Sequence, residues 1–120
     1  MKRILIADDQ ASSRELVRTV LEHFGHQVIE AADGAEAVAK ARETHPDLVM
    51  LDLHMPALDG FAAVGELRRE PSFAETPMVA LTASAMQGDR ERALAAGFSA
   101  YLTKPLRLAV LRSEVERLLR

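Results

Sequence analysis

The stretch LVMLD at residues 48–52 decides the fold of this 120-residue chain. Four consecutive apolar residues followed by an acid have the composition of a short strand that is buried on both faces of a sheet. Similar apolar runs occupy residues 4–7, 78–81 and 100–102, and a more mixed run at residues 27–31 also reads as a strand. The sequence therefore predicts five short strands, most of them fully buried.

Amphipathic stretches alternate with these runs. Apolar residues recur at helical spacing over residues 16–24, where Gly25 ends the helix, and again over residues 61–67 and 108–118. Asp33 and Glu36 form a capping pair for a helix that runs to about Glu43, and a further helix spans about residues 89–96. Strict alternation of strand and helix predicts an α/β fold, with a doubly wound five-stranded parallel sheet, right-handed crossovers and helices on both faces.

Length and composition bound the functional classes. We expect a single domain over residues 1–120, with an aliphatic core, because 48% of the residues are apolar and only 4% are aromatic. The absence of cysteine excludes disulfides and thiolate chemistry. The net charge of -3 gives no reason to expect direct binding to nucleic acid or to a membrane, and no apolar run approaches the roughly 18 residues of a membrane span. The expected location is the cytoplasm.

Polar side chains follow four of the predicted strands. Asp8 and Asp9 come after the first strand, Asp52 after the third, Thr82 after the fourth and Lys104 shortly after the fifth. Because sheets of this kind carry their chemistry at the carboxyl ends of the strands, we expect these five side chains to lie close together.

This set of side chains predicts phosphoryl chemistry. Three neighbouring carboxylates repel one another, and a hard divalent cation such as Mg²⁺ would balance them. A carboxylate such as Asp52 is a possible nucleophile toward phosphorus, and the metal and Lys104 would neutralise charge on the transferring group. Simpler interpretations are a turn or helix cap for Asp8 and Asp9, a solvated lysine for Lys104 and an ordinary strand-end hydroxyl for Thr82.

The chain resembles the receiver domain of two-component response regulators, the CheY-like superfamily. The matching pieces, in order, are residues 4–9, 47–53, 55–60, 77–83 and 101–105. The resemblance implies a flavodoxin-like fold in which Asp52 accepts the phosphoryl group and Asp9 binds Mg²⁺ directly. It also implies that Asp8 acts mainly through metal-bound water, and that the backbone carbonyl of His54 is a metal ligand.

The resemblance further implies a conformational switch. Thr82 would bond the phosphoryl group and Lys104 would pair with it, while Tyr101 would turn inward on phosphorylation. The competing interpretation of Tyr101 is a half-buried strand aromatic with its hydroxyl in water. His54 and Ser84 would tune the rates, and the simpler interpretation of His54 is a loop side chain at the mouth of the site. The Lys104–Pro105 peptide is typically cis in this family.

The implied partners are a histidine kinase or histidine phosphotransfer domain, which would dock at the first helix and the loops around the site, and a downstream protein. The downstream protein would bind the face formed by residues 89–96, 100–102 and 108–118. The chain would catalyse only its own phosphorylation and dephosphorylation, with no DNA-binding output domain in these residues. The stretch at residues 83–89 favours a stand-alone or hybrid-kinase receiver.

Three other functions compete with this interpretation. A phosphatase of the haloacid dehalogenase type would need a second Asp two residues past the nucleophile, where His54 stands. An FMN-binding module would need a hydroxyl- and Gly-rich phosphate loop where Asp8 and Asp9 stand. A receiver that has lost phosphorylation would not need to keep every chemical position filled, as they are here.

Overall fold

Five strands and five helices alternate along the chain in a computed structural model, which describes residues 2–83 and 88–120. The strands are β1 (Arg3–Ala7), β2 (Gln27–Ala31), β3 (Leu48–Asp52), β4 (Met78–Thr82) and β5 (Ala100–Thr103). The helices are α1 (Ala11–His23), α2 (Gly34–Thr44), α3 (Gly60–Arg68), α4 (Asp89–Ala96) and α5 (Leu108–Leu118), with a short 3-10 turn, η1, at Pro71–Phe73. Among the described helices, none is long and apolar enough to cross a membrane.

The five strands form one parallel sheet in the order β2-β1-β3-β4-β5. The chain runs outward from β1 to β2 and then returns past β1 to β3, so the strand order reverses between β1 and β3. At such a reversal the connections leave the sheet on opposite sides, which opens a crevice at the carboxyl ends of the two strands. The predicted α/β fold and parallel sheet are confirmed.

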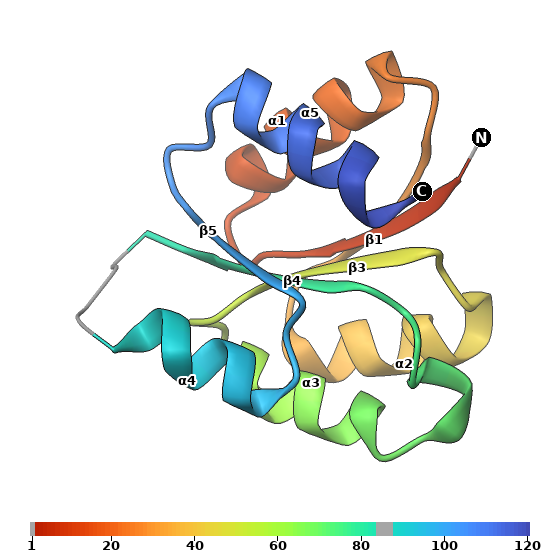
Figure 1. Cartoon of the computed structure of the whole chain (residues 1–120), viewed down its shortest axis with the longest axis vertical. Coiled ribbons are helices and arrows are strands. Elements are labelled where there is room, and N and C mark those ends of the chain that lie inside the picture. Colours follow the sequence, from red (N-terminus) through yellow and green to blue (C-terminus); the bar gives the residue numbers. More distant parts are fainter. Residues whose placement is uncertain (1, 84–87) are drawn as a thin grey trace.

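Helices cover both faces of the sheet, as Figure 1 shows, with α1 and α5 on one face and α2, α3 and α4 on the other. Successive strand residues point to opposite faces, so Ile4 and Ile6 pack in the layer under α1 and α5, while Leu5 packs in the layer over α2 and α3. Every residue of β3 is buried. This explains why residues 48–51 form an unbroken apolar run rather than an alternating one.

Two helix starts follow the local sequence closely. The Asp33 side chain accepts a hydrogen bond from the Glu36 N–H, and the Glu36 side chain accepts one from the Ala32 N–H, so the predicted capping pair of α2 is confirmed. Asp59 caps α3 by accepting from the Ala62 N–H at 2.8 Å. The first helix begins at Ala11, earlier than its apolar spacing indicates, because helix starts on the exposed side carry no apolar signal.

Candidate functional site

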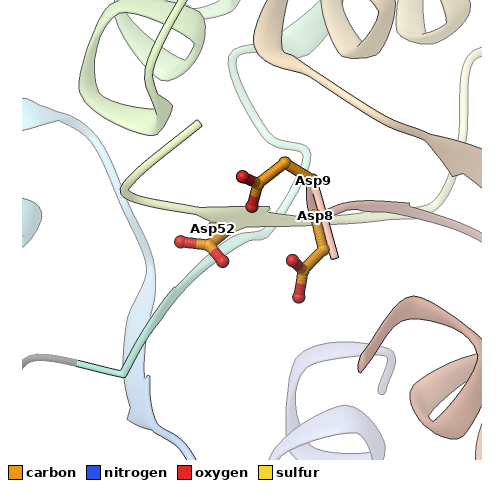
Figure 2. A group of neighbouring side chains, drawn as sticks. All are labelled: Asp8, Asp9 and Asp52. Atoms are coloured by element: carbon orange, nitrogen blue, oxygen red, sulfur yellow. The ribbon is translucent and has the colours of Figure 1, made fainter. Parts of the chain in front are cut away.

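Three carboxylates meet at the carboxyl end of the sheet. Asp8 directly follows β1 and Asp52 is the last residue of β3, so the pairing of these adjacent strands brings both acids to the crevice. Figure 2 shows the side chains of Asp8, Asp9 and Asp52 gathered at this edge. Each offers a carboxylate oxygen, and these oxygens lie within 4.8 Å of one another. Asp8 and Asp52 are buried, whereas Asp9 is exposed and opens the cluster to solvent.

One ammonium group bridges two of the acids. Lys104 Nζ lies 2.6 Å from Asp8 Oδ2 and 2.8 Å from Asp52 Oδ2. The lysine is the first residue after β5. Its backbone N–H donates to the Thr82 carbonyl at 2.8 Å. The peptide that follows it, Lys104–Pro105, is cis, as the resemblance implied. The ends of β1, β3 and β5 therefore supply the acids and the lysine, and the Thr82 carbonyl at the end of β4 holds the backbone of the lysine.

Backbone amides hold the remaining oxygens of the two buried acids. The Gln10 N–H donates to Asp8 Oδ1 and the His54 N–H donates to Asp52 Oδ1, each at 2.9 Å. Each carboxylate thus has one oxygen on a backbone amide and the other on the lysine. Paired charge-assisted bonds of this kind fix the plane of a carboxylate as well as its charge.

The charges of Asp8 and Lys104 stabilise each other. Burial by itself raises the pKa of Asp8, but hydrogen bonds from Lys104, the Gln10 N–H and the Ser13 hydroxyl outweigh burial and leave that pKa below its ordinary value. Burial likewise lowers the pKa of Lys104, but its bonds to Asp52 and Asp8 outweigh burial and leave it raised. Both groups therefore stay ionised near neutral pH.

These two shifts predict how stability depends on pH. The contribution of Asp8 is complete above its ordinary pKa of 3.8 and is lost as the pH falls through the lower pKa of the folded state. The contribution of Lys104 is complete below its ordinary pKa of 10.5 and is lost as the pH rises through the higher pKa of the folded state. Urea unfolding across a pH series should show stability falling at both limits, and Asp8→Asn should weaken the acid limb. An acid limb that Asp8→Asn leaves unchanged would contradict this assignment.

The donor set fits a small, hard divalent cation. All three side chains offer oxygen ligands, and a single ammonium leaves the three carboxylates with excess negative charge. Mg²⁺ prefers oxygen ligands and needs only one or two carboxylates, with carbonyls and water completing its shell. The exposed position of Asp9 leaves room for such water.

The structure places the other predicted residues around this cluster. Thr82 is the buried last residue of β4, one position beyond Leu81, which pairs with Asp52. The His54 side chain is exposed at the mouth of the site, in agreement with its interpretation as a loop residue. Ser84 lies outside the described residues.

Tyr101 differs from its simpler interpretation. The residue is half-buried, but its hydroxyl is shielded from water and has no hydrogen-bond partner in residues 2–83 and 88–120. Burial raises the pKa of Tyr101, and the negative charges of Asp89 and Glu91 raise it further. The competing interpretation of Tyr101 is therefore right about the half-buried ring and wrong about a hydroxyl in water.

One residue of the site was missed in the sequence. Arg14, on α1, donates from Nη1 to the backbone carbonyl of Asp8 at 2.8 Å and pairs with Glu30 through Nε at 3.1 Å. The available signal was Glu30 itself, an acid inside the mixed run that reads as a strand at residues 27–31. An acid in that position needs a cation nearby, but the strand alone does not say which one.

Comparison with known proteins gives one consistent result. Residues 4–116 match the family model of the response regulator receiver domain. The chain is 40% identical over 120 residues to the DNA-binding dual master transcriptional regulator RpaA of Synechocystis, covering all of this chain and 50% of that protein. It is 35% identical over 105 residues to the polar-differentiation response regulator DivK of Brucella ovis, covering 88% of this chain and 85% of that one.

A solved structure extends the comparison to the site. The receiver domain of the sensor histidine kinase PA1611 from Pseudomonas aeruginosa is 36% identical, with a TM-score of 0.91 over 98% of this chain and 97% of that one. That crystal structure has a magnesium ion coordinated in its active-site cleft. The chain spans about half the length of the curated relatives that it matches at 40% identity. The similar proteins thus include a DNA-binding regulator, a response regulator that is mostly covered by the match, and a kinase receiver.

Proposed function

Because the chain belongs to the response regulator receiver family, we propose that its Asp52 accepts a phosphoryl group from a phosphohistidine donor. Receivers are signalling modules of two-component systems, which interact with histidine kinases or phosphotransfer proteins and with downstream targets. The observation that carries the proposal is Lys104 Nζ, which reaches both Asp8 and Asp52 beside the third acid, Asp9. On this proposal residues 1–120 form one receiver domain.

The residues around Asp52 suit it to act as the nucleophile. A carboxylate oxygen of Asp52 attacks the phosphorus atom, the P–N bond of the donor breaks, and the imidazole nitrogen leaves with the electron pair. The His54 N–H and the Lys104 ammonium already hold the two Asp52 oxygens, so the carboxylate needs little reorganisation. Attack of water on the resulting acyl phosphate releases phosphate and restores Asp52. The catalysis proposed for the chain is limited to these two reactions on itself.

Mg²⁺ is the proposed cofactor. Asp8, Asp9 and Asp52, with the backbone carbonyl of His54, would hold it, and Asp8 would act mainly through water. When bound, the ion supplies positive charge to the oxygens of the transferring group. The side chains of His54 and Ser84 flank the site in this proposal and set the rates of phosphorylation and hydrolysis.

Thr82 and Tyr101 are the proposed switch. Thr82 ends β4 and pairs in register with Thr103, two residues past Tyr101 on β5, so the two strands connect both residues to the site. Turning the Tyr101 ring breaks no hydrogen bond of its hydroxyl among the described residues, which lowers the free-energy cost of the movement. Phosphorylation would then bias two conformations that are close in energy.

Two surfaces are proposed for partners. A groove of about 750 Å³ on the α4-β5-α5 face is lined by residues such as Arg90, Tyr101 and Val110, and we assign it to the downstream protein. A second, largely apolar groove of about 640 Å³ lies beside Lys104, where Leu16 of α1 is 65% exposed and Leu108 of α5 also faces solvent. We propose it as the docking surface for the donor histidine domain, because the groove lies beside the site.

The proposal is tested by measuring covalent phosphorylation of the protein. Incubation with Mg²⁺ and a small phosphodonor, such as acetyl phosphate, should add the mass of one phosphoryl group to the intact protein. Asp52→Asn should abolish this gain, because an amide is a poor nucleophile. The matched control is Asp59→Asn, which changes an acid in the following loop while keeping a residue type that caps α3. No gain in the wild-type protein, or an unchanged gain in Asp52→Asn, would overturn the proposal.

A further inference from the structure

A guanidinium from α1 reaches the backbone of the acidic site. Arg14 Nη1 donates to the Asp8 carbonyl at 2.8 Å, and Arg14 Nε lies 3.1 Å from Glu30 Oε1. The two side chains are only 19% and 25% exposed. This contact joins the β1–α1 turn to β2 through side chains.

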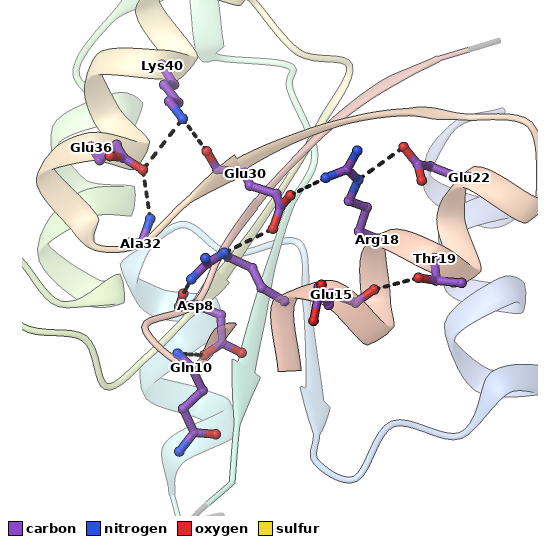
Figure 3. Close-up of polar contacts among 11 residues, drawn as sticks. Asp8, Gln10, Glu15, Arg18, Thr19, Glu22, Glu30, Ala32, Glu36 and Lys40 are labelled. Atoms are coloured by element: carbon purple, nitrogen blue, oxygen red, sulfur yellow. Dashed lines mark hydrogen bonds and ion pairs between the residues drawn. The ribbon is translucent and has the colours of Figure 1, made fainter. Parts of the chain in front are cut away.

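Glu30 is itself held in place. Its second oxygen accepts from Arg18 Nη1 at 2.7 Å, and its backbone carbonyl accepts from the Lys40 ammonium, as Figure 3 shows. Burial opposes ionisation of Glu30, but the hydrogen bonds from Arg18 and Arg14 keep its pKa below the ordinary value. A fixed, ionised Glu30 restricts the Arg14 guanidinium to one orientation, since the planar fork is bound on two sides.

The Asp8 backbone is thereby fixed at both of its polar groups. The Asp8 N–H donates to the Ala31 carbonyl of β2 at 3.1 Å, and the Asp8 carbonyl accepts from Arg14. That carbonyl belongs to the planar peptide unit that ends at the Asp9 Cα, so holding the carbonyl also holds the atom from which the Asp9 side chain leaves the chain.

Asp9 depends on this backbone support. Within residues 2–83 and 88–120, its exposed side chain takes part in no hydrogen bond or ion pair. Asp8 and Asp52 are oriented by their own side-chain contacts, whereas the position of Asp9 within the cluster rests on the peptide that Arg14 holds.

We propose that Arg14 is a positioning residue. It holds the Asp9 carboxylate next to those of Asp8 and Asp52, and Glu30 orients the Arg14 guanidinium. The proposal rests on the assignment of these three acids to Mg²⁺ and phosphoryl binding. Arg14 contacts none of the three carboxylates and acts only through the Asp8 carbonyl.

If Arg14 acted only through its charge, removing it would strengthen Mg²⁺ binding, whereas a positioning role predicts weaker binding. Removing a cation near an acidic site strengthens its attraction for Mg²⁺. Removing a group that orients a metal ligand weakens metal binding, typically by about 10- to 100-fold. The sign of the change therefore separates the two roles of Arg14.

The first measurement is Mg²⁺ affinity by isothermal titration calorimetry on folded protein. Arg14→Gln should bind Mg²⁺ about tenfold more weakly than wild type. Arg18→Gln is the matched control, because it removes the same charge and a contact to the same Glu30 but leaves the Asp8 carbonyl untouched, and it should stay within about twofold. Arg14→Lys should recover part of the loss, since one ammonium can replace one of the two contacts. Equal or tighter binding by Arg14→Gln overturns the proposal.

The second measurement needs no metal. In EDTA, the Gln10 amide, which donates to Asp8 Oδ1, should exchange with deuterium about tenfold faster in Arg14→Gln than in Arg18→Gln at equal global stability. Equal exchange rates in the two variants contradict the positioning role. If the wild-type protein itself binds no Mg²⁺, the proposed function fails, and the exchange comparison still decides the role of Arg14.

Discussion

Replacing Lys104 by methionine should lower the free energy of unfolding of the metal-free protein by about 3 kcal/mol, the lower end of the cost of breaking a buried ion pair. Asp8 is fully buried and would lose its cation, keeping only the Gln10 N–H and the Ser13 hydroxyl. Asp52 would lose the same partner. Methionine preserves the apolar stem, so urea unfolding would report the charge rather than a cavity. Phosphorylation should slow by about a hundredfold, because a preorganised cation is removed from the transferring group.

Two further variants separate the contribution of the buried Lys104–Asp8 ion pair to the free energy of unfolding from other effects. Lys40→Met removes an ammonium whose side chain is 40% exposed and should cost less than about 1 kcal/mol. Adding Asp8→Asn to Lys104→Met should restore part of the lost stability, since the uncompensated charge is then gone. A Lys104→Met protein as stable as wild type would show that Asp8 is solvated well enough without the lysine.

Gly60→Ala should destabilise the protein by about 3 kcal/mol, as overpacking against backbone does. A Cβ on Gly60 would lie 2.5 Å from the Asp52 carbonyl oxygen and 2.9 Å from Leu53 Cα, and neither backbone atom can rotate away. The Gly60 N–H also donates to the Leu53 carbonyl at 3.2 Å, so α3 begins directly against the strand end that carries Asp52. Movement there would displace the nucleophile, and phosphorylation should slow together with the loss of stability.

The same helix supplies the control. Gly65, also in α3, has open space where its Cβ would be, so Gly65→Ala should raise the free energy of unfolding by about 0.5–1 kcal/mol. Thermal or urea unfolding of the two variants should thus give changes of opposite sign. Similar effects for both substitutions would refute the close approach of Gly60 to Asp52.

Much of the site was predictable because parallel strands align their carboxyl ends. Once residues 4–7 and 48–51 read as buried strands, Asp8 and Asp52 had to end at the same edge, and the structure confirms this. Lys104 was predictable in the same way, from its place after the fifth strand. Its double contact was not, because spacing along the chain cannot tell which of three acids a flexible lysine will reach.

Other features depend on which elements become neighbours. The support of Asp8 by Arg14 and Glu30 requires α1 to lie beside β2, and the contact joins residues sixteen positions apart. The shielded Tyr101 hydroxyl follows from packing around β5, whereas the sequence alone left a hydroxyl in water as a competing interpretation. Side-chain packing of this kind leaves no periodic signal.

By itself, the sequence determined the order of strands and helices, the parallel sheet and the set of acids, hydroxyl and lysine at its edge. Burial pattern and strand polarity are local or repeating properties, so they can be read along the chain. Only the tertiary structure decided that Lys104 bridges Asp8 and Asp52, that Gly60 must lack a side chain and that Arg14 fixes the peptide before Asp9. Those contacts join distant segments at hydrogen-bond or van der Waals distance, and that precision arises only when the sheet and its helices pack together.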